Sequence, residues 1–196
     1  MVSSVKKGLT PSKKVGGAPY TGGMNEYPIA NAYAVALFKG DPVKLSGGVV
    51  VRAESSVGAD PLLGVFQGCQ YIDSATGQLI NSSYFPASTS SAGTINGYAQ
   101  PLALVIDDPD TVYIIPSTVT VTTGMVGTRY RLSVTTGNTA TGQSNTVLDT
   151  TLTVDASSGA HVRVVGVYKI PNQTLGSTDD FVVECVLAST GYIGLQ

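Results

Sequence analysis

The feature that most constrains the fold is a regular alternation between short β-type runs and turn signals. Runs rich in Val, Ile, Tyr and Phe are interrupted about every 8–15 residues by Gly, Pro, Asn or Asp. The clearest runs are 43–45, 61–73, 101–106, 111–116, 129–134, 161–170 and 181–189. We find no convincing long amphipathic helix. The pattern predicts an all-β fold, either a sandwich or a barrel that resembles a jelly roll.

Alternation within the runs predicts which side chains face the core. In 129–134, Tyr130, Leu132 and Val134 share one face, and the intervening positions are two arginines and a serine. The run 118–123 alternates Thr and Val strictly. We therefore expect a half-buried strand at 129–134 and an exposed strand at 118–123.

Two other segments carry more specific expectations. Gly64 and Gly68 lie inside the run 61–73, where a glycine marks a bulge or a close approach of another backbone. The segment Tyr27–Phe38 is ambiguous, because it fits a short helix from Asn31 as well as a strand. Alternation with Ala slightly favours a strand there.

Charge is sparse and unevenly distributed. Charged residues make up 12% of the chain and the net charge is −2. Residues 1–25 contain no acid, are rich in Gly and Pro, and carry four lysines, Lys6, Lys7, Lys13 and Lys14. This composition predicts an extended basic N-terminal arm over 1–25 and a single acidic β domain over 26–196. The arm suits an acidic partner, and an acidic body argues against direct binding of nucleic acid.

Residues that could carry catalysis are few. His161 is the only histidine, so a two-histidine metal site is impossible and a structural role is expected. Cys69 and Cys185 lie in apolar runs, which favours buried free thiols, although one long-range disulfide is possible. The first residues lack the apolar core of a signal peptide, and no apolar run reaches the ~20 residues of a membrane span.

The acidic segment Asp107–Asp110 is the best candidate for a ligand site. Asp107, Asp108 and Asp110 place three carboxylates in four residues, which makes them a weak Ca²⁺ candidate. However, Asp and Pro are also strong turn residues, and no calcium-loop pattern follows. We expect a turn, no cofactor and no enzymatic activity.

Several short motifs follow one another along the chain. They start with Gly8-Leu9-Thr10-Pro11, continue through Tyr27-Pro28-Ile29 and reach Gly40-Asp41-Pro42-Val43. The strand "LLGVFQGCQYID", the element "IDDPDTVYIIP" and the closing pattern "TGQSNTVLDTT" with "VRVVGVYKIPNQTLG" come after them. This order resembles that of a family of virion structural proteins of tailed bacteriophages from marine and freshwater hosts. The last ten residues depart from the family pattern.

The resemblance implies a cement, or decoration, protein on the exterior of the capsid, made in the cytoplasm of the host bacterium. Its partner would be the major capsid protein, and it would bridge neighbouring capsomers against the internal pressure of DNA. Self-association as a homotrimer, or alternatively a dimer, would multiply weak contacts. The residues expected to dock the arm are Lys6, Lys7, Leu9, Lys13, Lys14, Tyr20, Met24 and Tyr27.

Three alternatives stay open at this point. The chain could be another virion component, such as a head fibre, a head-completion protein or a tail protein. It could be a carbohydrate-binding adhesin, because ten tyrosines could build a sugar platform, although the absence of Trp weakens this. A hydrolase is the weakest alternative, since it would depend on His161 alone.

Overall fold

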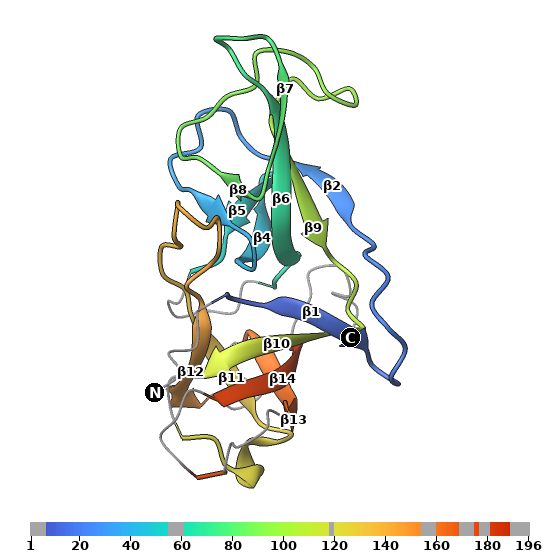
Figure 1. Ribbon diagram of the computed structural model, residues 1–196, viewed down its shortest axis with the longest axis vertical. Helices are drawn as coiled ribbons and strands as arrows, with labels where there is room; N and C mark the ends of the chain where they lie inside the picture. The colour runs from blue at the N-terminus through green and yellow to red at the C-terminus, as the bar shows by residue number, and fades with distance from the viewer. Residues whose placement is uncertain are drawn as a thin grey trace.

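The computed structural model describes residues 7–54, 61–117, 120–153, 160–168, 175–176 and 181–188 (Figure 1). These residues form β-strands and one short 3₁₀ helix, η1 (Thr123–Met125). The all-β prediction is therefore confirmed. The strands make two lobes, a barrel in the lower half of Figure 1 and an open sheet in the upper half. Within the described residues, no helix is long and apolar enough to cross a membrane.

The lower lobe is a barrel, because its strand order closes on itself. The order is β1-β10-β12-β11-β13-β14, and β14 pairs back onto β10. One edge of β10 pairs with β14, while β1 and the parallel strand β12 share the other edge. The strands are β1 (Thr10–Lys14), β10 (Thr111–Ser117), β11 (Arg129–Ser133), β12 (Val147–Thr153), β13 (Val162–Val167) and β14 (Phe181–Leu187).

The upper lobe is an open sheet with the order β2-β9-β6-β4-β5. The strand β7 extends it by pairing with the second half of β6, and β3 and β8 form a separate two-stranded ladder. The strands are β2 (Asn25–Pro28), β3 (Leu37–Phe38), β4 (Pro42–Ser46), β5 (Val49–Arg52), β6 (Gly64–Ile72), β7 (Leu79–Ser82), β8 (Tyr84–Phe85) and β9 (Leu102–Ile106).

The two lobes have distinct hydrophobic cores of different composition. Among the described residues, the upper core contains only side chains of the upper lobe, such as Phe66 and Phe85. The barrel core contains Tyr113 and Phe181 together with four residues that belong to the upper lobe, namely Ala53, Leu62, Val65 and Ile106. The base of the upper lobe therefore closes one end of the barrel.

Several local predictions are confirmed. Tyr130 and Leu132 are buried in the barrel core, and Val134 packs against it. Gly64 lies so close to β9 that an added Cβ would stand 2.1 Å from the carbonyl oxygen of Ile106. The register between β6 and β9 shifts next to Gly68, which fits the expected bulge.

Two local predictions are wrong. In 118–123 only 120–123 lie in the described part, and they form no strand: Val121 is fully buried and Thr123 begins η1. The Thr/Val alternation gave a wrong prediction because Val121 faces the barrel core although its backbone is not paired with another strand. The segment Tyr27–Phe38 is neither one helix nor one strand, since β2 ends at Pro28, a turn follows, and β3 begins at Leu37.

The division into an arm over 1–25 and a body from 26 is also corrected for the described residues 7–25. Thr10–Lys14 forms β1 of the barrel, and Asn25 begins β2 of the upper sheet. Leu9 is 1% exposed and belongs to the barrel core. A Gly- and Pro-rich composition predicted an extended chain, but the extended chain gains its hydrogen bonds from the body itself.

A buried carboxylate joins the lobes at the turn between β3 and β4. Asp41 is fully buried, and its Oδ2 accepts a hydrogen bond from the backbone N–H of Phe38 at 2.9 Å. Its Oδ1 accepts hydrogen bonds from the hydroxyls of Ser144 and Thr146, in the loop between β11 and β12. The backbone N–H of Leu9 donates to the Gly40 carbonyl at 3.0 Å beside this junction. The barrel loop, the upper lobe and the N-terminal segment therefore meet here.

Candidate docking surface

The N-terminal segment from β1 to β2 passes from one lobe to the other beside the turn between β9 and β10. After β1 the chain turns back, with the N–H of Lys14 bonded to the Ala18 carbonyl at 2.7 Å. The N–H of Val15 donates to the carbonyl of Asp110 at 2.7 Å. Because β1 pairs with β10 and β2 pairs with β9, the crossing segment encloses the turn 107–110 on both sides.

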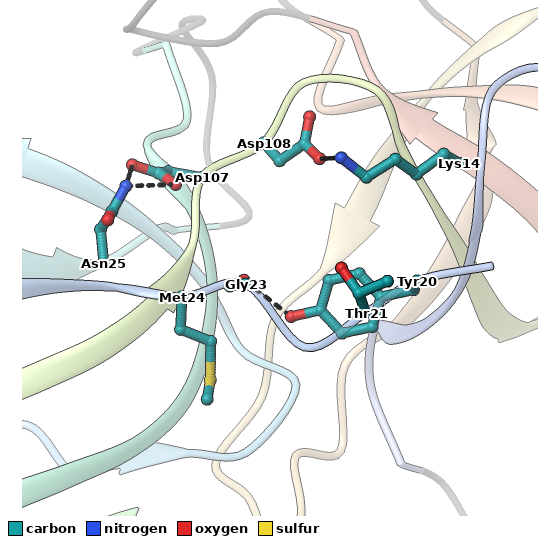
Figure 2. Close-up of a pocket in the computed structure, with 8 residues that line it drawn as sticks. All are labelled: Lys14, Tyr20, Thr21, Gly23, Met24, Asn25, Asp107 and Asp108. Atoms are coloured by element: carbon teal, nitrogen blue, oxygen red, sulfur yellow. Dashed lines mark hydrogen bonds and ion pairs between the residues drawn. The ribbon is translucent and has the colours of Figure 1, made fainter. Parts of the chain in front are cut away.

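The carboxylates of this turn are held by donors from the crossing segment (Figure 2). Asp107 accepts two hydrogen bonds from the Asn25 amide, at 2.8 and 3.0 Å, and one from the Tyr27 hydroxyl at 2.5 Å. Asp108 forms an ion pair with the Lys14 ammonium at 2.7 Å and also accepts the backbone N–H of Asp110. The hydrogen bond with Lys14 lowers the pKa of Asp108 and raises that of Lys14.

These contacts confirm the turn at 107–110 and show how the carboxylates of the calcium candidate are already bonded. Asp108 closes an Asx turn onto Asp110, as expected of Asp next to Pro. Asp107 and Asp108 already have protein donors, so a cation would have to displace them. Within the described ranges, no three His, Cys, Asp or Glu side chains gather as a metal-binding group.

A shallow hollow of about 260 Å³ lies against the crossing segment. It is lined by Lys14, Tyr20, Thr21, Gly23, Met24, Asn25, Asp107 and Asp108 (Figure 2). The Tyr20 hydroxyl donates to the Gly23 carbonyl at 2.8 Å, which fixes the bend of the segment. Met24 is 45% exposed, so it offers an apolar contact at the surface. The hollow can therefore contribute contact area, but its charged groups satisfy one another.

The structure separates the residues expected to dock the arm into three groups. Leu9 is buried, and Tyr20 and Tyr27 pack against the barrel core and the upper core respectively. Lys13 pairs with Glu184 of β14 at 2.8 Å, and Lys14 pairs with Asp108. Lys7 and Met24 are exposed, whereas Lys6 lies outside the described residues. Five of the eight residues thus serve the fold of this chain, in part or wholly.

His161 and the two cysteines have structural environments. His161 is 5% exposed, and its Nδ1 accepts the backbone N–H of Leu132 at 3.1 Å. Burial lowers its pKa, and Arg131 and Lys44 lower it further. Cys69 and Cys185 are buried free thiols, as predicted, and burial raises the pKa of Cys69 to about 12. Thiols with a raised pKa stay protonated and are poor nucleophiles at neutral pH.

Sequence reasoning missed two features at the junction of the lobes. Asp41 was noticed only as part of a motif, although the structure makes it a buried link between lobes. Lys39, two residues before it, is exposed beside the N-terminal segment and was not singled out. A Gly-Asp-Pro sequence predicts a local turn, but it does not predict that the Asp41 carboxylate bonds to Ser144, about 100 residues away in the chain.

We compared the chain with family models, with curated proteins and with solved structures, and none of the three comparisons gave a match.

Proposed function

We propose that this chain is a cement protein of a bacteriophage head, which binds the outer surface of the shell and bridges neighbouring subunits. The order of its motifs, which resembles that of virion structural proteins, supports the proposal. The structure changes how the contact would be made. Because residues 7–25 belong to the folded body, we propose that the body itself, rather than a separate arm, makes the contact.

The observation that carries the proposal is the linkage of the two lobes. The crossing segment, the turn 107–110 and the Asp41 junction connect the barrel with the upper sheet at separate points. Four upper-lobe side chains also complete the barrel core. Such links hold the two lobes in a fixed relation, because packed cores resist deformation. A bridge between subunits under tension needs this property.

The surface chemistry also suits a structural role. Charged residues are sparse, at 12% of the chain, so large polar-neutral areas can be buried without removing many charges from water. His161, Cys69 and Cys185 are buried within the body, and His161 accepts a backbone hydrogen bond. These observations favour contact over catalysis as the function.

The partner that we propose is the major capsid protein, and self-association would add avidity. A trimer on local threefold axes is the first choice and a dimer the second. Once one protomer of an oligomer has bound the shell, binding of the next protomer is effectively intramolecular. Modest affinities of the individual protomers are then sufficient for stable attachment.

The test is a copy count on purified virions of the phage that carries this gene, by quantitative mass spectrometry against the major shell protein. We expect a ratio that corresponds to decoration of the whole shell. Purified protein should also rebind heads from a deletion strain and raise their resistance to heat. A few copies per particle would assign the chain to a vertex or the tail. Absence from virions, or binding to host glycans instead, would overturn the proposal.

A further inference from the structure

A groove at the junction of the lobes is distinct from the hollow beside the 107–110 turn. It has a volume of about 430 Å³ and is lined by Lys7, Leu9, Thr10, Pro11, Lys39, Gln67, Thr141 and Gln143. These residues come from the start of β1, the β3–β4 turn, β6 and the β11–β12 loop. Figure 1 shows β1 lying between the barrel and the upper sheet, which places the groove between the two lobes.

The groove is positively charged, since its described lining contains two lysines and no acid. Lys13 and Lys14, farther along β1, are neutralised by Glu184 and Asp108. Lys7 and Lys39 are exposed, and neither forms an ion pair within the described part of the chain. Of the basic N-terminal residues that the structure describes, Lys7 is therefore the one whose charge remains available.

The backbone that carries Lys39 is held in place from both sides. Its N–H donates to the Gly142 carbonyl at 3.0 Å, and its carbonyl accepts the N–H of Ser144 at 2.9 Å. Lys7 precedes Gly8, whose position is fixed by its close approach to Gly40. The two ammonium groups thus extend from rigid parts of the structure, which limits the entropy lost when a ligand binds.

One residue of the groove lining carries a hydrogen-bond donor that is not used. The amide nitrogen Nε2 of Gln67 is buried and has no hydrogen-bond partner among the residues that the structure describes. A buried donor without an acceptor is unfavourable, so a ligand oxygen placed there would be favoured. Two ammonium groups and an amide donor together match the oxygens of carboxylates.

An acidic peptide fits these features better than a nucleic acid does. Among its described lining residues, the groove has no aromatic side chain on which a base could stack. Pro11 lacks an N–H and hinders addition of a strand along β1, so recognition would depend on side chains.

We propose that this groove binds an extended, carboxylate-bearing segment of the shell protein, with Lys7 and Lys39 contacting its acidic side chains. The inference rests on the proposed cement function, and it names the surface and the chemistry of the contact. It differs from the expected docking by the N-terminal lysines, because Lys13 and Lys14 are paired within the chain and Lys39 of the body joins Lys7, while Lys6 lies outside the described residues.

The test uses the full chain and a fluorescein-labelled octapeptide of alternating Ser and Glu, with Ser-Gln as the neutral control peptide. We compare wild type, the double variant Lys7→Gln/Lys39→Gln, and the matched double variant Arg129→Gln/Arg163→Gln. The matched pair removes the same charge from neighbouring barrel strands, where Arg129 lies opposite Arg163. Fluorescence anisotropy at about 50 mM salt gives the affinities, and thermal melting confirms that each variant folds.

We expect the acidic peptide to bind wild type and to bind the lysine variant at least about tenfold more weakly, with the arginine variant changed less than about twofold. Equal losses of peptide affinity in both variants would show a general effect of charge and overturn the proposal that the peptide binds in the groove. A single-stranded oligo-dT that binds more tightly than the peptide, through the same lysines, would overturn the choice of partner. If wild type and the lysine variant bind heads equally well, the groove is not the docking site, but the proposed cement function stands. If wild type does not bind heads, the function itself fails.

Discussion

The barrel and the upper sheet differ in how they complete their cores. In the described part of the chain, every member of the upper core comes from the upper lobe. The barrel is closed by hydrogen bonds around its circumference, yet its core includes Ala53, Leu62, Val65 and Ile106 from the upper lobe. Closure of a β-barrel removes exposed strand edges but leaves its ends open. In this protein the upper lobe covers one end, so the barrel depends on its neighbour more than its neighbour depends on the barrel.

The largest effects are expected from substitutions that disrupt one hydrophobic core at a time. Phe66→Ala in the upper core and Phe181→Ala in the barrel core each remove a buried ring, and each should lower the free energy of unfolding by about 3–5 kcal/mol. Their regional effects should differ. Loss of Phe66 should reduce amide-exchange protection in both lobes, whereas loss of Phe181 should reduce it mainly in β10, β13 and β14.

Hydrogen exchange followed by mass spectrometry measures this difference, with Val15→Ala as the control because Val15 is 59% exposed. If the two phenylalanine variants lose amide-exchange protection in the same regions, the lobes depend on each other equally, and the proposed one-sided dependence of the barrel on the upper lobe is wrong.

The second prediction addresses the close contact that joins the N-terminal segment to the upper lobe. An added Cβ at Gly8 would stand 2.5 Å from the Gly40 carbonyl oxygen and 2.6 Å from Cβ of Ser144. Gly8→Ala should lower the free energy of unfolding by about 2–5 kcal/mol, because overpacking adds to the cost of a positive φ. Gly16→Ala is the matched control, since Gly16 also has a positive φ but open space around it. Urea denaturation should give only about 1–2 kcal/mol for the control. Equal losses would mean that the junction tolerates a methyl group.

The third prediction concerns the Asp41 junction. Asp41→Ala leaves the Phe38 N–H without its acceptor and removes one of the two acceptors of the Ser144 hydroxyl, so it should lower the free energy of unfolding by about 1–3 kcal/mol. Asp41→Asn keeps an acceptor and should cost less. Thermal melting at several pH values separates the variants.

The pH dependence has a definite sign. Burial raises the pKa of Asp41 above its ordinary value, although hydrogen bonds from Ser144 and Phe38 oppose this. The unfolded state therefore releases this proton at lower pH than the folded state does. The contribution of Asp41 to stability is present in acid and is lost as pH rises from the ordinary value through the raised one. Asp41→Asn should remove this part of the pH profile. A wild-type profile unchanged by the substitution would show that the Asp41 carboxylate does not titrate with folding.

Local sequence patterns predicted most of the strands and failed where distant residues decide the outcome. Alternation at Tyr130 and Leu132, and turn residues at Asp108, act over a few residues and could be recognised directly. The role of residues 7–25 could not be predicted, because composition does not reveal that β10 and β9 offer free edges for β1 and β2. The groove was missed for the same reason, since Lys7 and Lys39 become neighbours only through the contact between Leu9 and Gly40.

The smallest expected effect distinguishes the two kinds of N-terminal lysine. Lys13 bonds both carboxylate oxygens of Glu184, and this pair ties β1 to β14 across the barrel surface. The Lys13 side chain is 41% exposed, so solvent screens the pair and Lys13→Gln should lower the free energy of unfolding by only about 0–1 kcal/mol. Lys7→Gln, which breaks no ion pair in the described part of the chain, should leave stability unchanged. Urea denaturation at low and high salt measures both, and the loss for Lys13→Gln should shrink as salt rises. If Lys7→Gln proved the more destabilising of the two, Lys7 would have a role in the fold itself, and its availability to a partner would have to be abandoned.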